Sequence, residues 1–125
     1  ADACSLPAEL VDFDAVLMAN LLCRLPSPKS LLGRLGGERG LVKVGGLLAL
    51  FSPYSWLAQF TPKEAWLGGF EQDGQPVKSS DALKAYLQDE GFVLLREEEV
   101  PLVIREHARK YQFIVTHGML WQRAR

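Results

Sequence analysis

The residues best suited to chemistry in this sequence are aromatic, and they gather in one connecting segment. That segment spans positions 54–70 and also contains polar residues typical of turns. Its aromatic members are Tyr54, Trp56, Phe60, Trp66 and Phe70. Aromatic faces suit a planar ring or a cation, so the segment is a candidate binding loop for a small molecule. The alternative is a loop that folds over the sheet and packs with its own side chains.

Other reactive residue types have simpler explanations. Cys23 is more typical of a small buried hydrophobe than of a nucleophile. His107 and His117 have no cysteine or carboxylate cluster at ligand spacing, which argues against a metal site. The acidic run Glu97–Glu99 is interpreted as a solvated strand end, although a charged hairpin of this kind could touch a carboxylate substrate. Its basic complement on the next turn consists of Arg105, Arg109 and Lys110.

The composition bounds the class of protein. The chain has 125 residues, of which 48% are hydrophobic and 23% charged, and its net charge is -1. These values predict one compact domain over residues 1–125 and exclude a disordered or fibrous chain. Because the charge is nearly balanced, we expect a small-molecule or protein partner and no nucleic acid. No apolar run approaches the ~20 residues of a bilayer span, so no membrane partner is expected.

Cysteine usage and the start of the chain bear on location and completeness. Cys4 and Cys23 are too few for a disulfide framework, and no signal-peptide pattern occurs near the start. We therefore expect a cytoplasmic protein. The sequence begins at Ala1 without a methionine and soon enters the apolar segment Phe13–Leu17, so we expect a piece of something longer.

The elements that must position these residues alternate between strands and helices. The predicted strands are the apolar runs Phe13–Met18, Leu47–Phe51, Phe92–Glu98 and Tyr111–Gln122, the last of them interior. The predicted helices begin at Ser27-Pro28, at a capping box over Thr61–Glu64 and at Ser79-Ser80. Val44–Gly46 is interpreted as a turn and Gly91 as a left-handed helix cap. The order predicts an α/β fold with helices packed on a mostly parallel sheet and an antiparallel last strand.

Two sets of short motifs carry a resemblance to known enzymes. The first set is Asp2-Ala3, Leu6-Pro7, Phe13–Leu17, Leu25-Pro26, Val44–Leu48 and Gly91-Phe92. It resembles the C-terminal half of a class I S-adenosylmethionine-dependent methyltransferase. The second and more particular set is Ala19–Pro26, Ser52–Trp56, Phe60–Gly69 and Arg109–Phe113. It is similar to the 4-mercaptohistidine N1-methyltransferase family, the methylating domain of ovothiol biosynthesis.

The resemblance implies a partial Rossmann-like methyltransferase sheet. Its strand order would be 4-5-7-6, with the seventh strand antiparallel. The family's first two strands and most of its third are missing from the sequence, and with them the glycine-rich turn and the acidic residue that hold the cofactor. No G-x-G-x-x-G occurs among the glycines. We therefore expect this chain to bind S-adenosylmethionine weakly or not at all.

The resemblance also implies residues for the site. Asp2 suits the exocyclic amine of adenine and the backbone at Ala3 a ring nitrogen, while the alternative for Asp2 is a solvated chain end. Asn20 follows a strand at the carboxyl edge, where open α/β sheets bind ligands, although its turn-forming tendency explains it equally well. The expected contacts to the substrate, a thiol-substituted histidine, are Tyr54, Trp56 and Trp66.

The chemistry implied is methyl transfer from a sulfonium to an imidazole nitrogen. This displacement neutralises charge, so positioning in a dry pocket can supply most of the acceleration. Tyr54 is the expected catalytic residue, because its phenol could orient or deprotonate the ring. Glu64 could do the same, but the capping box already explains it.

A second hypothesis gives the chain a structural function, as a catalytically inactive half-domain that associates with itself or binds another protein. The strand Phe13–Met18 would then present an unpaired backbone edge and an apolar surface. Such an edge is a template for pairing with another copy. We therefore expect a homodimer through residues 13–18.

Overall fold

The fold is built on a mixed β-sheet of four long strands. The computed structural model describes residues 2–125. Its strands are β1 (Phe13–Ala19), β2 (Val42–Ser52), β3 (Phe70–Gln72), β4 (Gln75–Val77), β5 (Phe92–His107) and β6 (Lys110–Arg123). Its helices are α1 (Pro28–Leu32) and α2 (Ser79–Asp89), with the 3-10 turns η1 (Leu22–Arg24) and η2 (Lys63–Ala65). The predicted α/β class is confirmed in this coarse form.

The four long strands lie side by side in the order β1-β2-β6-β5. β1 and β2 are parallel, with Leu17 beside Ala49. β6 runs antiparallel to both of its neighbours, and Met119 pairs with Leu50 on one side and with Glu97 on the other. The fourth long strand is therefore interior and antiparallel, as the sequence predicted.

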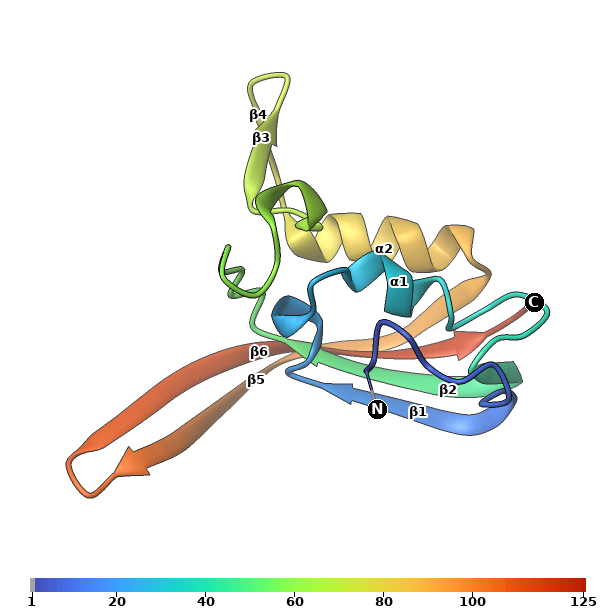
Figure 1. Cartoon of the computed structure of the whole chain (residues 1–125), viewed down its shortest axis with the longest axis horizontal. Helices are drawn as coiled ribbons and strands as arrows, with labels where there is room; N and C mark the ends of the chain where they lie inside the picture. Colours follow the sequence, from blue (N-terminus) through green and yellow to red (C-terminus); the bar gives the residue numbers. More distant parts are fainter. Residues whose placement is uncertain (1) are drawn as a thin grey trace.

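Both helices cover the same face of the sheet (Figure 1). α2 buries Leu83 and Leu87, which are four residues apart and so share one stripe of the helix. They belong to one core cluster with Leu50 and Trp121 from the sheet. Full burial of a leucine contributes about 1.5–3 kcal/mol, so this layer carries much of the stability. None of the helices formed by residues 2–125 is long and apolar enough to cross a membrane.

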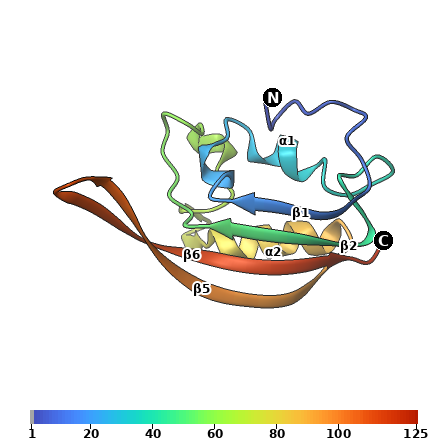
Figure 2. The same ribbon diagram turned by 90° about the horizontal axis from the view of Figure 1, so that it is seen from below.

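The opposite face of the sheet is bare within the described part of the chain (Figure 2). Leu17 is 68% exposed there, whereas its neighbour Met18 is buried toward the helices. A hollow of about 210 Å³ is lined in part by Ala49, Phe51 and Leu120. β1 is also an edge strand. An apolar face and an open edge thus occur together.

The β5–β6 hairpin extends far beyond the rest of the sheet (Figure 1). β2 ends at Ser52, opposite His117 of β6, and from there outward β5 and β6 pair only with each other. We call residues 100–116 the arm. The sequence predicts that the third long strand ends at Glu98, within the acidic run. Cross-strand pairing instead carries the strand to His107.

Two local predictions were wrong, and one hairpin was not predicted. Val44–Gly46 lies inside β2, where a register shift against β1 absorbs Gly45 at a φ of +84°. No capping box forms, because Pro62 stands at the N-cap of η2 and the Thr61 hydroxyl instead donates to the Leu25 carbonyl at 2.5 Å. The β3–β4 hairpin over residues 70–77 was not predicted at all.

Candidate functional site

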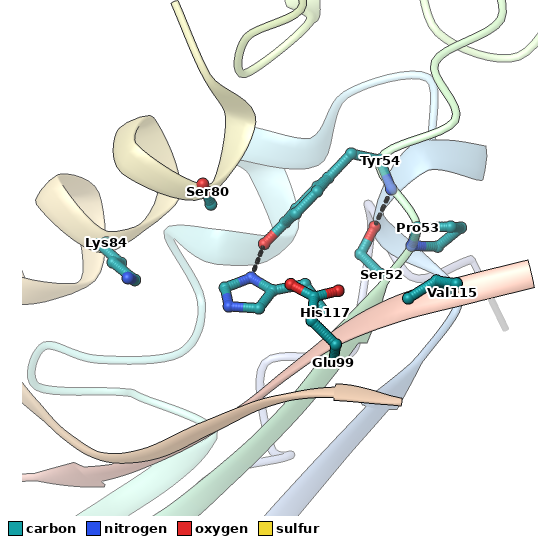
Figure 3. A pocket seen from close by; sticks show the side chains of 8 residues that line it. All are labelled: Ser52, Pro53, Tyr54, Ser80, Lys84, Glu99, Val115 and His117. Atoms are coloured by element: carbon teal, nitrogen blue, oxygen red, sulfur yellow. Dashed lines mark hydrogen bonds between the residues drawn. The ribbon is translucent and has the colours of Figure 1, made fainter. Parts of the chain in front are cut away.

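A cavity of about 300 Å³ opens where β2 ends. Its walls come from the end of β2 and the following loop, the first turns of α2, and the facing parts of β5 and β6 (Figure 3). The lining residues are Ser52, Pro53, Tyr54, Ser80, Lys84, Glu99, Val115 and His117. This is the carboxyl end of a parallel strand, the edge at which open α/β sheets bind ligands.

The backbone after β2 turns sharply to place Tyr54 over the cavity. Tyr54 has a φ of +54°, a left-handed conformation that costs a non-glycine residue about 1–2 kcal/mol. The buried Ser52 compensates in part, since its hydroxyl accepts a hydrogen bond from the Tyr54 amide at 3.1 Å. Strained backbone of this kind is concentrated at functional sites. The turn aims the phenol of Tyr54 at β6.

Tyr54 and His117 are joined by a short hydrogen bond (Figure 3). The Tyr54 hydroxyl lies 2.7 Å from His117 Nδ1, and the two rings are tilted with centroids 5.8 Å apart. On the other side of the imidazole, Nε2 lies 2.9 Å from Glu97 Oε2. The Lys84 ammonium contacts the same carboxylate, at 2.7 Å from Oε2. Four side chains from three elements and a loop thus form one polar chain.

The direction of these hydrogen bonds follows from the donor inventory. An ionised carboxylate is an acceptor only, so Nε2 of His117 must donate to Glu97. In the neutral imidazole the other nitrogen, Nδ1, is then an acceptor and receives the Tyr54 hydroxyl proton. Because the carboxylate fixes the tautomer, the Nδ1 lone pair is held facing the phenol.

The surrounding charges and burial give Tyr54 and Glu97, the side chains on either side of His117, opposite protonation states. Burial, together with the negative charges of Glu99 and Glu97, raises the pKa of Tyr54 far above its usual range. Hydrogen bonds from Lys84 and then His117 lower the pKa of Glu97. At neutral pH the phenol is therefore protonated and the carboxylate is ionised, with the His117 imidazole between them.

This arrangement can move a proton without forming a covalent bond to the protein. A neutral phenol is a weak nucleophile but a good hydrogen-bond donor, and its proton can pass to Nδ1 when its oxygen takes another. Glu97 would stabilise the resulting imidazolium. Lys84 and Ser80 offer further donors on the α2 side of the cavity. The site is suited to a polar ligand that loses a proton.

Of the predicted substrate contacts, only Tyr54 lines this cavity. Trp56 is buried behind the loop, where its indole N–H donates to Ser79 Oγ at 2.8 Å. Trp66 stacks on Trp56 with centroids 6.4 Å apart, and its N–H donates to the Thr61 carbonyl. The structure brings the two tryptophans together, but their contacts hold the segment that carries Tyr54 in place and do not line the cavity.

The predicted cofactor contacts lie outside the cavity that Tyr54 lines. Asp2 is exposed, and its Oδ1 accepts the Cys4 amide in a turn at 2.9 Å. Ala3 packs against the core. Asn20 is exposed and directly follows β1. Its backbone has a φ of +53°, and its backbone N–H donates to the Phe51 carbonyl. None of the three belongs to the lining of the Tyr54 cavity.

Sequence reasoning missed His117, Glu97 and Lys84 as members of the site. Glu97, whose carboxylate contacts His117, pairs with Met119 across the hairpin, and Glu99, which lines the cavity, pairs with His117. Extending the third strand past Glu98 would have placed His117 beside the acidic run Glu97–Glu99. Among residues 2–125, no group of three or more His, Cys, Asp or Glu is arranged to hold a metal ion.

Comparison with known proteins places the fold in context. No protein-family model matches the sequence, and no curated protein matches it closely enough to be significant. Among solved structures, the chain is similar to one described as showing the conversion of a disulfide bond into a thioacetal group during echinomycin biosynthesis. The match has a TM-score of 0.60 at 17% identity and covers 98% of this chain and 54% of that one.

The chain therefore spans about half the length of the solved structure it matches. At this level of identity the similarity shows the fold alone. The shared fold is an α/β arrangement, a mixed sheet with helices on one face.

Proposed function

We propose that this chain is a portion of an S-adenosylmethionine-dependent N-methyltransferase, one that methylates the imidazole of a thiol-substituted histidine, as in ovothiol biosynthesis. One observation carries the proposal: a polar cavity at the carboxyl end of β2 holds Tyr54 hydrogen-bonded to His117, in a fold consistent with a methyltransferase. The motif resemblance supplies the substrate class, and the cavity supplies groups that suit an imidazole.

In this proposal β1, β2, β6 and β5 correspond to the fourth, fifth, seventh and sixth strands of a methyltransferase sheet. The observed order β1-β2-β6-β5, with β6 antiparallel, is compatible with that correspondence. The bare face and the free β1 edge would then be covered by the remaining strands and helices of the domain. A cytoplasmic location is part of the same proposal.

By the motif resemblance, the residues present would serve only the nucleoside end of S-adenosylmethionine. The exposed Asp2 carboxylate and the exposed Asn20, at the end of β1, would hold adenosine together with the Ala3 backbone. Among residues 2–125 no G-x-G-x-x-G pattern is present for the amino-acid end. When bound, the cofactor supplies an electrophilic methyl group on a sulfonium sulfur.

Tyr54 is the residue that would touch the acceptor ring. Its oxygen accepts the proton that the imidazole nitrogen loses on methylation, while its own proton moves to Nδ1 of His117. Glu97 then stabilises the imidazolium through Nε2. Proton count is conserved, since one proton leaves the substrate and one arrives on His117. Trp56 and Trp66 contribute by holding the loop in place.

Calorimetric titration of the chain with 4-mercaptohistidine tests the proposal. We expect binding that is lost in the double variant Tyr54→Phe with His117→Ala and retained in His107→Ala, the matched control. Titration with S-adenosylhomocysteine is expected to show weak binding or none. Sub-millimolar affinity for S-adenosylhomocysteine would contradict the proposal that this chain lacks the residues that hold the amino-acid end of the cofactor. No binding of the thiol-substituted histidine would contradict the proposed acceptor site.

A second candidate function is that of a binding module without catalysis. The open edge of β1 and the exposed side chains of Phe13, Leu17 and Val44 favour it, because apolar edges attract other chains. The occupant would be a second copy, giving a homodimer through residues 13–18, or another protein. Light scattering at tens of micromolar tests the homodimer: Leu17→Lys should convert it to a monomer, and a monomeric wild-type chain would eliminate it.

A further inference from the structure

The arm exposes apolar side chains that two strands alone cannot shelter. Val103 is 61% exposed, Tyr111 58% and Phe113 70%. An isolated two-stranded hairpin is marginally stable in water, and exposed apolar patches usually mark contact surfaces. Figure 1 shows the arm projecting along the long axis, away from both helices. The arm therefore has the character of a docking surface.

One face of the arm carries a specific order of side chains. Directly paired residues share a face of a β-ribbon. The face begins at the base of the arm with the pair Glu99 and His117 and continues along the arm with Pro101 and Val115, Val103 and Phe113, and Arg105 and Tyr111. From base to tip the face is therefore acidic, then apolar, then basic. The Arg105 guanidinium lies over the Tyr111 ring, 5.9 Å from its centroid, which confirms that both belong to this face.

The charges at the two ends of this face are unpaired, unlike those around them. Glu97 is paired with Lys84 and His117, Glu98 with Arg96, and Glu106 with Lys110. In the described part of the chain, neither Glu99 nor Arg105 takes part in a salt bridge. Each end of the face thus keeps one charge without an ion-pair partner, although the Arg105 guanidinium also contacts the His107 carbonyl and the Tyr111 ring.

This pattern is complementary to itself when it is read in reverse. Glu99 and Arg105 are six residues apart, roughly 20 Å along an extended strand. A two-fold axis near Leu102 would superpose acidic on basic and apolar on apolar. An isologous interface needs one patch that matches its own rotated copy.

We propose that two copies of this chain dimerise by packing these arm faces against each other in antiparallel orientation. Val103 and Phe113 of each copy cover Pro101 and Val115 of the other, and Glu99 pairs with Arg105 of the partner subunit. The occupant of the arm is thus a second copy of the chain. The proposal does not depend on the methyltransferase assignment.

The dimer would also complete the Tyr54 cavity. Glu99 and Val115 line that cavity as well as the arm face, so the two surfaces are continuous. Arg105 of the partner subunit would therefore arrive at the rim of the cavity, beside Glu99. A guanidinium at this rim would suit a ligand that carries a carboxylate. One copy alone leaves that side of the site open.

Analytical ultracentrifugation of wild type and charge variants tests the proposal. We expect the wild-type chain to dimerise, more weakly at high salt. Arg105→Glu and Glu99→Arg should each raise the dimer dissociation constant by about tenfold or more, since each places like charges opposite each other. The double variant Glu99→Arg with Arg105→Glu should restore dimerisation, because the pair is only exchanged. Arg109→Glu, an equal charge change in the turn of the hairpin, is the matched control.

Two outcomes would overturn the inference. One is a wild-type chain that stays monomeric at all concentrations. The other is a dimer that Leu17→Lys disrupts and Arg105→Glu does not, which would locate the interface at β1. Phe113→Ser provides an uncharged check, because Phe113 is exposed and its loss should weaken the dimer while circular dichroism stays unchanged.

Discussion

The hydroxyl of Tyr54 lies 2.7 Å from Nδ1 of His117, although the two residues are 63 positions apart in the chain. Tyr54 reaches this position through a left-handed backbone turn after β2, and His117 through the register that sets it opposite Ser52. The contact joins the aromatic loop to the sheet, and the following predictions depend on it or on the elements that hold it.

The first prediction concerns alkaline pH. Because burial raises the pKa of Tyr54, its neutral form is favoured by folding, and the stabilisation is complete below the unfolded pKa of about 10 and lost as pH rises further. The free energy of unfolding of wild type should thus fall more steeply above pH ~10 than that of Tyr54→Phe. Tyrosinate absorbance checks the assignment: Tyr54→Phe should remove the last phenol to ionise. Equal slopes for both proteins would contradict it.

The second prediction concerns acid. The hydrogen bonds from Lys84 and His117 lower the pKa of Glu97, so its contribution to stability is present above the unfolded pKa of about 4.3 and disappears as pH falls through the lower folded value. Glu97→Gln should flatten the acid limb of the stability curve. Glu98→Gln, a neighbour whose salt bridge to Arg96 lies outside this network, is the control. Carbon NMR of the side-chain carboxyls provides the direct titration, and an unshifted Glu97 would refute the network.

The third prediction tests whether Trp56 stabilises the loop or contacts the substrate. Trp56→Phe leaves the buried Ser79 hydroxyl without its partner, so we expect a loss of about 1–3 kcal/mol in the free energy of unfolding. Adding Ser79→Ala to Trp56→Phe should cost less than the sum of the single changes, since both remove the same hydrogen bond. Affinity for 4-mercaptohistidine should change little at a temperature where the variant is folded. A large loss of affinity with normal stability would make Trp56 a substrate contact.

The fourth prediction uses two glycines with left-handed backbone. Gly91 has a φ of +92°, and a Cβ there would lie 2.5 Å from Arg125 Cγ and 3.0 Å from the Arg125 carbonyl oxygen. Gly37 has a φ of +80° with nothing within 4 Å of such a Cβ. Gly37→Ala should therefore cost only the backbone strain, about 1–2 kcal/mol, and Gly91→Ala clearly more. Chemical denaturation measures both, and equal costs would show that the C-terminal residue yields freely.

Much of the fold was predictable because its signals are local. Apolar runs located all four long strands, the stripe through Leu83 and Leu87 located α2, and Gly91 ended that helix in the predicted left-handed conformation. Of the arm, only the β6 side was predicted, as part of the strand Tyr111–Gln122. The β5 side beyond Glu98 was not predicted, because the polar run Arg96–Glu99 interrupts the apolar pattern and only cross-strand hydrogen bonds carry the strand on. The β3–β4 hairpin, with two three-residue strands, is too short to leave a periodic signal.

Of the site residues, Tyr54 could be predicted from the sequence and His117 could not. Tyr54 stood out as part of an aromatic segment, but nothing local to His117 distinguishes it from a solvated histidine. Its importance arises from register, which places it beside Glu99 and Ser52 from two other strands. Likewise Thr61 formed a plausible capping box by spacing, yet tertiary packing directs its hydroxyl to Leu25.

The central claim is that the cavity lined by Tyr54 and His117 receives the methyl acceptor. The chain contains two histidines, so His107 in the arm is a built-in reference. Nitrogen NMR of the imidazoles, recorded during titration with 4-mercaptohistidine, tests the claim most directly. The account predicts a saturable shift of the His117 ring nitrogens, absent in Tyr54→Phe, with His107 unchanged. No response of His117, or an equal response of both histidines, would contradict it.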